Sequence, residues 1–197
     1  MTFALGLTGS IGMGKSTTAQ LFADEGCGIW DADAAVHRLY DVGGAAVAAL
    51  AAKFPYAIVD QKIDRAALRD IISKDPSSLA QIEAIVHPLV AADRADFRAS
   101  AAEEILVFDI PLLFETGGHT SMDAVACVWT DPATQRQRVM DRGTMTVEQF
   151  EQILQKQMPI EEKKSRSDYL IQTDSLDHAR QQVRDILNAI RKQLHHA

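Results

Sequence analysis

A glycine-rich segment near the start of the chain has the spacing of a phosphate-binding loop. Gly9 and Gly14, followed by Lys15 and Ser16, fit the pattern Gly-x-x-x-x-Gly-Lys-Ser. Glycines allow backbone N–H groups to turn toward an anion, and the start of the next helix adds partial positive charge. We expect Lys15 to reach the β- and γ-phosphates of a nucleotide and the Ser16 hydroxyl to ligate Mg²⁺. The predicted nucleotide-binding residues of the loop are Gly9, Ser10, Ile11, Gly12, Met13, Gly14, Lys15, Ser16 and Thr17.

Acidic residues follow two further apolar runs, at places where strands of a sheet would end. Asp31 and Asp33 lie two residues apart, so in a strand their carboxylates would point to the same side. One of them could accept a proton from an attacking hydroxyl or hold the metal, and the alternative is that they cap the helix that follows. Asp109 ends another apolar run, where a carboxylate often binds Mg²⁺. For Asp109 the alternative is a plain turn at the end of a strand.

Arginines form a second concentration of positive charge, at Arg136, Arg138 and Arg142. Arg138 and Arg142 are four residues apart and therefore share one face of a helix. On a hinged helical lid they could spread positive charge over a phosphoryl group during its transfer. The alternative is a solvated basic face with Asp141 or Glu148 as partners.

The elements that must position these residues alternate between strands and helices. Short apolar runs predict buried strands, and helical periodicity fills most of the segments between them. Strands are expected at 3–8, 28–30, 105–110, 124–129 and 169–171, and helices at 15 to about 23, 132–142, 147–157 and about 175–194. Thr146 and Gln149 form a capping box before one of these helices. The alternation predicts an α/β protein with a parallel sheet.

One long stretch departs from this alternation. From about residue 34 to residue 100 the pattern is only helical, with breaks expected at Gly43 and Gly44, around Pro55, at Pro76, and where His87 meets Pro88. We expect an inserted helical subdomain here.

Composition limits the classes of protein that remain. A chain of 197 residues with 47% hydrophobic residues can bury a sizeable core. The formal net charge of −7, without an extended Lys/Arg stripe, argues against non-specific nucleic-acid binding. There is no signal peptide pattern and no long uncharged apolar window, so a soluble cytoplasmic protein without a membrane partner is expected. Cys27 and Cys127 lie far apart in apolar surroundings, which favours buried, inert thiols.

Seven segments in order resemble the dephospho-coenzyme A kinase family. They are GLTGSIGMGKST, DADAAVH, KIDRAALRDII, LAQIEAIVHPLV, DIPLLFE, QRQRVMDR and QMPIEEKKSRSDYLI, and the resemblance runs from Leu5 to about Thr173. It implies a three-layer fold of the P-loop NTPase type, with a parallel sheet, an inserted helical substrate domain and a helical lid. It also implies transfer of the γ-phosphate of ATP, with Mg²⁺, to the ribose 3′-hydroxyl of dephospho-CoA, the last step of coenzyme A synthesis.

The same resemblance implies roles for individual residues. Asp33 would be the base that faces the acceptor hydroxyl, with Lys15 and Arg142 as the other catalytic residues. Arg138 and Arg142 would bind ATP, and Ser16 and Asp109 would hold the metal. The residues expected to contact the acceptor are Thr8, Asp33, His37, Arg65 and His87.

The resemblance implies one kinase domain in three parts. The core would comprise about 1–40, 101–131 and 165–197, the helical insertion about 41–100, and the lid about 132–164. We expect a monomer or a weak homo-oligomer. The chain departs from the family pattern at Ser10 in place of glycine, at Ile72 in place of phenylalanine, and at Gln172, Thr173 and Asp174, which replace an acidic-Asn pair at the end of a strand.

Two other functions are compatible with a phosphate-binding loop. The first is another small-molecule kinase, such as a nucleoside monophosphate kinase, which the length of the helical insertion disfavours. The second is a nucleotide-dependent switch. A guanine-nucleotide switch ordinarily carries an Asn-Lys-x-Asp segment, which this sequence lacks.

Overall fold

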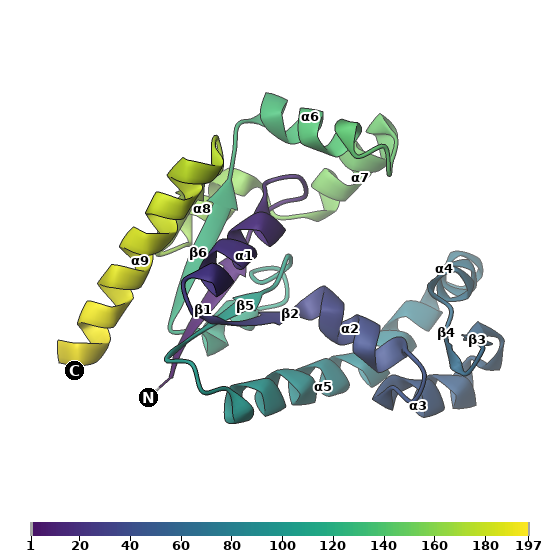
Figure 1. The fold of residues 1–197 in the computed structure, drawn as a ribbon. Coiled ribbons are helices and arrows are strands. Elements are labelled where there is room, and N and C mark those ends of the chain that lie inside the picture. The colour runs from purple at the N-terminus through teal and green to yellow at the C-terminus, as the bar shows by residue number, and fades with distance from the viewer. Residues whose placement is uncertain (1, 197) are drawn as a thin grey trace. The chain divides into compact units, whose positions relative to one another are not determined.

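The computed structural model describes residues 2–196, with side chains as far as residue 195. The described chain forms two compact units (Figure 1). The first runs from the N-terminus to Trp30 and resumes at Ala101, and the second is Asp31–Ser100. Each unit has its own hydrophobic core, so each is described separately below.

The first unit is built on a five-stranded sheet with the strand order β2-β5-β1-β6-β7. The strands are β1 (Phe3–Thr8), β2 (Gly28–Asp31), β5 (Ile105–Asp109), β6 (Ala124–Trp129) and β7 (Tyr169–Gln172). β1 pairs in parallel with β5 and with β6, and β6 pairs in parallel with β7. The predicted α/β fold with a parallel sheet is therefore confirmed.

Helices and a loop cover the two faces of this sheet. Ala126 and Val128 of β6 lie in the core beneath α1 (Lys15–Asp24) and α9 (Leu176–His196), which also pack against each other. Val125, on the opposite face of the same strand, packs with Leu113 and Phe114 of the loop after β5. The sheet thus lies between two layers, as a three-layer fold requires.

Three more helices of the first unit lie between β6 and β7. They are α6 (Pro132–Asp141), α7 (Val147–Lys156) and α8 (Ile160–Ser165), and a 3₁₀ turn, η2 (Gly118–Ser121), precedes β6. The capping box of Thr146 and Gln149 is present at the start of α7. The sequence patterns did not predict α8, because its six residues are too few to display a helical period.

The second unit is mainly helical, as expected of the insertion. It contains α2 (Ala32–Tyr40), α3 (Ala45–Lys53), α4 (Arg65–Lys74) and α5 (Ser77–Ser100), with a 3₁₀ turn, η1 (Pro55–Ala57), and two short strands, β3 (Ile58–Val59) and β4 (Lys62–Ile63). Its core is formed by apolar side chains from these elements, among them Leu39, Leu50, Leu68, Ile82 and Val86.

Two expectations for this stretch were wrong. The break expected at His87 and Pro88 is absent, because α5 continues through Pro88. Ile82 and Val86 hold the helix on the core, which offsets the backbone hydrogen bond that a proline removes. The strands β3 and β4 form an antiparallel hairpin that the helical pattern hid. Its turn residues, Asp60 (φ 49°) and Gln61 (φ 62°), lack the glycine that usually marks such a turn.

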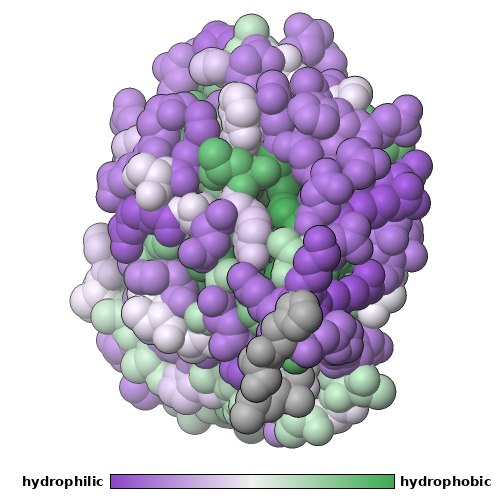
Figure 2. All heavy atoms as spheres, turned by 90° about the vertical axis from the view of Figure 1, so that its left-hand side faces the viewer, coloured by the Kyte–Doolittle hydropathy of each residue, from purple (hydrophilic) through white to green (hydrophobic). Residues whose placement is uncertain are grey.

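The surface on the side of α9 is mostly hydrophilic, with a group of strongly hydrophobic residues near the centre of the view and weaker hydrophobic areas toward its lower edge (Figure 2). In the described part of the chain, none of the helices has the length and apolar character that crossing a membrane requires. Cys27 and Cys127 are buried and form no disulfide, as predicted. Burial raises the pKa of both thiols to about 11, so they are inert near neutral pH.

Candidate functional site

The glycines of the phosphate-binding loop adopt conformations and contacts that a side chain would disturb. Gly12 (φ 77°) and Gly14 (φ 89°) lie in the left-handed region. A Cβ on Gly12 would lie 2.5 Å from Cγ2 of Val139, and one on Gly9 would lie 2.7 Å from the carbonyl oxygen of Val128. No described side chain caps the start of α1 at Gly14. Backbone N–H groups at this helix start are therefore available to an anion.

Lys15 is the first residue of α1 and makes a buried ion pair. Its Nζ donates to Oδ1 of Asp109, and the two side chains are 15% and 1% exposed. The sheet brings them together, since Asp109 at the end of β5 pairs with Leu7 of the neighbouring strand, just before the loop. The predicted phosphate-binding cation and the predicted metal ligand are thus direct partners.

The remaining loop residues divide by burial. Ser16 and Thr17 are exposed in the first turn of α1, where their hydroxyls can reach a bound molecule. Ser10 and Met13 are buried, so these two residues offer a ligand backbone groups rather than side chains. The thioether of Met13 accepts a hydrogen bond from the backbone N–H of Thr130 at 3.1 Å.

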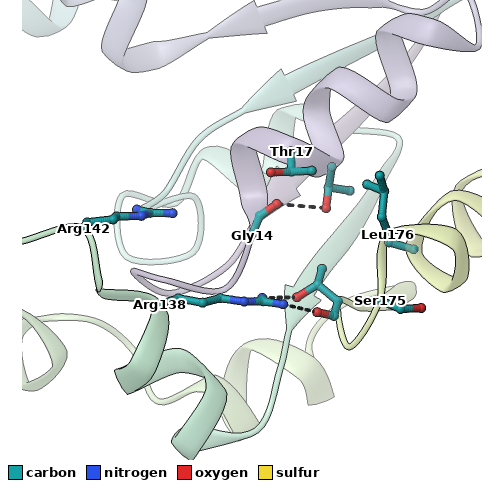
Figure 3. Close-up of a pocket in the computed structure, with 9 residues that line it drawn as sticks. Gly14, Thr17, Arg138, Arg142, Ser175 and Leu176 are labelled. Carbon is teal, nitrogen blue, oxygen red and sulfur yellow. Dashed lines mark hydrogen bonds between the residues drawn. The ribbon is translucent and has the colours of Figure 1, made fainter. Parts of the chain in front are cut away.

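A cavity of about 220 Å³ lies beside the loop (Figure 3). Arg138 crosses it from α6 and donates from Nη1 to the hydroxyl of Thr173 (2.9 Å) and from Nη2 to the carbonyl of Thr173 (2.5 Å). Arg142 follows α6 and is exposed at the cavity. The lining residues are Gly14, Thr17, Thr18, Arg138, Arg142, Thr173, Ser175, Leu176 and Ala179.

Only two of the three clustered arginines line this cavity. Arg136 instead lies 3.6 Å from Glu151, with both side chains more than half exposed. The solvated-face alternative therefore describes Arg136, whereas Arg138 and Arg142 line the cavity beside the loop.

Thr173 belongs to this site, although sequence analysis assigned it no role. It is buried after β7, and its hydroxyl donates to the carbonyl of Met13 at 2.8 Å while accepting from Arg138. It therefore connects the phosphate-binding loop to α6. The one sequence feature that drew attention to Thr173 was its departure from the family pattern, and that departure did not indicate which residues Thr173 contacts.

Thr8, the last residue of β1, shares a hydrogen-bond acceptor with a buried lysine. Its hydroxyl donates to the carbonyl oxygen of Pro111 at 3.1 Å. The same oxygen accepts from Nζ of Lys163 at 2.8 Å, and Lys163 also pairs with Glu115 at 2.9 Å. The Lys163 side chain is fully buried. Sequence analysis assigned Lys163 no role, because its partners Pro111 and Glu115 are distant in the sequence.

Asp31 and Asp33 were expected to project together from the end of a strand, but the structure places them differently. β2 ends at Asp31, whose Oδ1 accepts from the backbone N–H of Ala34 at 2.8 Å and caps α2. Asp33 lies in the first turn of that helix and is exposed. The strand-end interpretation was wrong because α2 begins at Ala32, before Asp33, and the capping alternative is correct for Asp31.

The second unit contains a cavity of about 160 Å³ that is lined by charged side chains of both signs, by the phenol ring of Tyr40 and by the imidazole of His37. It brings together His37 and Arg65, two of the expected acceptor contacts, and the guanidinium of Arg65 lies 5.7 Å from the ring centre of Tyr40. Burial raises the pKa of Tyr40, and the charge of Arg65 opposes that change. The lining residues are His37, Tyr40, Asp41, Lys62, Ile63 and Arg65.

His87 is separate from this group. It is exposed on α5 and is not among the described residues that line the cavity. Lys62 belongs to the cavity although sequence analysis gave it no role, because the hairpin that carries it was not predicted.

Comparison with known proteins decides the family. The family model for dephospho-CoA kinase matches residues 3–178. The chain belongs to the dephospho-CoA kinase family. A dephospho-CoA kinase of Ruegeria pomeroyi is 69% identical, covering 97% of each chain, and one of Cereibacter sphaeroides is 56% identical, covering 96% of each.

Solved structures agree with this assignment. A protein of Thermus thermophilus matches with a TM-score of 0.84 and 30% identity, covering 98% of each chain. A dephospho-CoA kinase from Campylobacter jejuni matches with a TM-score of 0.71 and 26% identity, covering 98% of this chain and 99% of that one. A shikimate kinase of Acinetobacter baumannii, 18% identical with a TM-score of 0.55 and covering 98% and 95%, shares the fold. The chain is thus an enzyme of a kinase family.

Proposed function

We propose that this chain transfers the γ-phosphate of ATP to the ribose 3′-hydroxyl of dephospho-CoA, yielding coenzyme A and ADP. The observation that carries the proposal is the phosphate-binding loop with Lys15 at the uncapped start of α1, in a chain of the dephospho-CoA kinase family. In this reaction the acceptor oxygen forms a bond to the γ-phosphorus, the bond from that phosphorus to the bridging oxygen of ADP breaks, and the hydroxyl proton leaves to a base.

The triphosphate of ATP would lie on the loop from Gly9 to Thr17. Lys15 would leave Asp109 for the β- and γ-phosphates, which attract its ammonium through direct charge-assisted hydrogen bonds. The cavity beside Gly14 would hold the adenine, because it adjoins the loop and is lined by Leu176 and Ala179 as well as by polar groups. Arg142 would approach the phosphates from the edge of this cavity.

Mg²⁺ would be held by Ser16 and Asp109 together with phosphate oxygens. A hydroxyl and a carboxylate are the hard oxygen donors that Mg²⁺ prefers, and this ion is usually bound by few protein groups and by substrate phosphates. Among the described residues no cluster of three or more His, Cys, Asp or Glu side chains could hold a metal ion without the phosphates. When bound, the ion neutralises charge on the phosphates.

The acceptor would bind to the second unit. Lys62 and Arg65 supply two cations for the phosphate groups of dephospho-CoA, and the ring of Tyr40 offers a flat apolar face. Asp33, on the same unit and exposed, would be the base for the 3′-hydroxyl. His87 would contact a more distant part of this long molecule. Thr8, whose hydroxyl is engaged by Pro111, would support the site from the end of β1.

The working form would be a cytoplasmic monomer or weak homo-oligomer that binds ATP and dephospho-CoA but no nucleic acid. Its three parts would be the core, the acceptor-binding insertion, and a lid at 132–164 that closes over the phosphates.

One assay tests the proposed reaction against the alternatives. Purified protein with ATP, Mg²⁺ and dephospho-CoA should give a product heavier by one phosphate, located on the ribose 3′-oxygen and identified by mass spectrometry and fragmentation. AMP as acceptor and GTP as donor should react far more slowly. Folded protein that binds ATP but phosphorylates AMP in preference to dephospho-CoA would instead identify a nucleoside monophosphate kinase.

A further inference from the structure

The phosphate-binding loop is held at one residue by two glutamines that come from opposite ends of the α6–α7 segment. The backbone N–H of Ile11 donates to Oε1 of Gln157 at 3.1 Å. The carbonyl oxygen of Ile11 accepts from Nε2 of Gln135 at 2.7 Å. Gln135 lies in the first half of α6, and Gln157 is the capping residue that directly follows α7. Both backbone groups of one loop residue are therefore engaged by side-chain amides.

The packing around Ile11 leaves little freedom for this arrangement to change. Gln135 is buried at 5% exposure. A Cβ on Gly12, the next loop residue, would lie 3.0 Å from the carbonyl oxygen of Gln135 and closer still to Val139. The loop thus rests directly on α6, and the two amides fix its backbone direction just before the N–H groups that face the phosphates.

We propose that Gln135 and Gln157 are positioning residues that tie both ends of the α6–α7 segment to the phosphate-binding loop. This inference rests on the proposed function and deepens it, since the segment between them carries Arg138 and Arg142. The two anchors set the direction of the loop N–H groups and fix the base from which Arg142 reaches the phosphates. Lid motion would then be confined to the stretch between them that follows Arg138, since Arg138 is itself bonded to Thr173.

Hydrogen-bond chemistry fixes which amide atom faces Ile11 at each position. A backbone N–H can only donate, so Gln157 must present its oxygen, and a carbonyl can only accept, so Gln135 must present its NH₂ group. An ionised glutamate therefore preserves the contact at 157 and abolishes it at 135. Both substitutions place a negative charge beside the same loop residue, so repulsion of the nucleotide is common to them. Because Gln135 is buried and Gln157 only partly buried, urea denaturation of each variant measures the different cost of burying the charge apart from the loss of the hydrogen bond.

The experiment measures the dissociation constant for MgADP by calorimetry, and then kcat and KM, for matched variants. Gln135→Met and Gln157→Met should each weaken MgADP binding about 10-fold, the effect of one buried hydrogen bond left incomplete. Gln135→Glu should bind about 10-fold more weakly than Gln157→Glu. The control, Gln137→Met on α6, removes an exposed amide bonded to Asp141 and should leave binding unchanged.

A second measurement separates positioning from general stability. In the free protein, amide hydrogen exchange at Ile11, followed by NMR, should accelerate in Gln157→Met and stay near wild type in Gln157→Glu. The double Met variant should lose less than the product of the single losses, because both amides act on one residue. The KM for dephospho-CoA at saturating ATP should not change.

Other outcomes overturn the proposal. Wild-type MgADP affinity and kcat in both Met variants would show that the contacts do not position the loop, and equal affinities in the two Glu variants would show that the bond direction is irrelevant. If the buried Gln135 variants fail to fold, the comparison of Gln157→Met with Gln157→Glu decides alone. MgADP binding needs no acceptor, so failure to phosphorylate dephospho-CoA would reject the proposed function without affecting this test.

Discussion

Lys15 and Asp109 form a buried ion pair at the point where the phosphate-binding loop meets the end of β5. Under the proposed function each has another partner, because Lys15 binds phosphate and Asp109 binds Mg²⁺. The pair therefore satisfies both charges before the nucleotide arrives and must exchange partners when MgATP binds. A buried charge left without its counter-charge is expensive, which gives this exchange a measurable consequence.

We predict that Lys15→Met both abolishes phosphoryl transfer and destabilises the protein. The substitution keeps an unbranched side chain of nearly the same length but removes the ammonium from a carboxylate that is 1% exposed, at an expected cost of about 3 kcal/mol in the free energy of unfolding. Urea denaturation measures the loss. Adding Asp109→Asn should restore much of the stability without restoring activity. Unchanged stability in Lys15→Met would contradict a tightly coupled pair.

Asp33→Asn should lower kcat by about 10²- to 10⁴-fold while leaving the dissociation constant for ATP nearly unchanged, because an amide cannot accept the hydroxyl proton. Asp31→Asn is the matched control. Asparagine caps helices about as well as aspartate, so this variant should retain its stability and rate. Steady-state kinetics and ATP calorimetry check both. Wild-type turnover in Asp33→Asn would show that Asp33 is not the catalytic base and acts only as an acidic residue in the first turn of α2.

Arg142→Ala should act mainly on the transition state and lower kcat by up to about 10³-fold, with a much smaller effect on ATP affinity. Arg142 precedes Gly143, whose positive φ of 61° and open surroundings suit a hinge. Arg142→Lys should recover only part of the rate, since a point charge lacks the planar fork of arginine. Arg136→Ala, which removes an exposed pair with Glu151, serves as the control. Equal losses in ATP affinity and in kcat/KM would identify Arg142 as a ground-state clamp.

Local sequence patterns correctly predicted the features that depend only on residues close together in the sequence. The strand before the loop, the glycines and the capping box at Thr146 depend on neighbours within a few residues, and the structure contains them as expected. The roles of Thr173 and Lys163 depend on partners distant in sequence, such as Met13 and Pro111, which no local pattern contains. The same reason explains why a helix break was wrongly predicted at Pro88, where tertiary packing outweighs the local preference of proline.

The pairing of Lys163 with Glu115 yields a prediction about pH. Partial burial of Glu115 opposes ionisation, but hydrogen bonds from the Lys163 ammonium and the backbone N–H of Met158 outweigh it, so the pKa of Glu115 is lowered from its ordinary 4.5. A lowered folded-state pKa means that the unfolded chain binds the proton more readily. The pair therefore contributes stability at neutral pH, and that contribution is lost as the pH falls from about 4.5 through the lower folded-state value.

Glu115→Gln tests this relation. At pH 7 the variant leaves a fully buried ammonium opposite a neutral amide, so its free energy of unfolding should fall below that of the wild type. The difference should shrink as the pH drops below about 4.5, because the wild-type carboxyl then becomes neutral as well. Urea denaturation of both proteins from pH 7 downward measures the convergence. Glu162→Gln, which alters an exposed pair with Arg166 at 3.6 Å, is the control, and it should show little loss at any pH. A constant difference between Glu115→Gln and the wild type across this range would mean that the glutamate stabilises the loop through its shape rather than its charge.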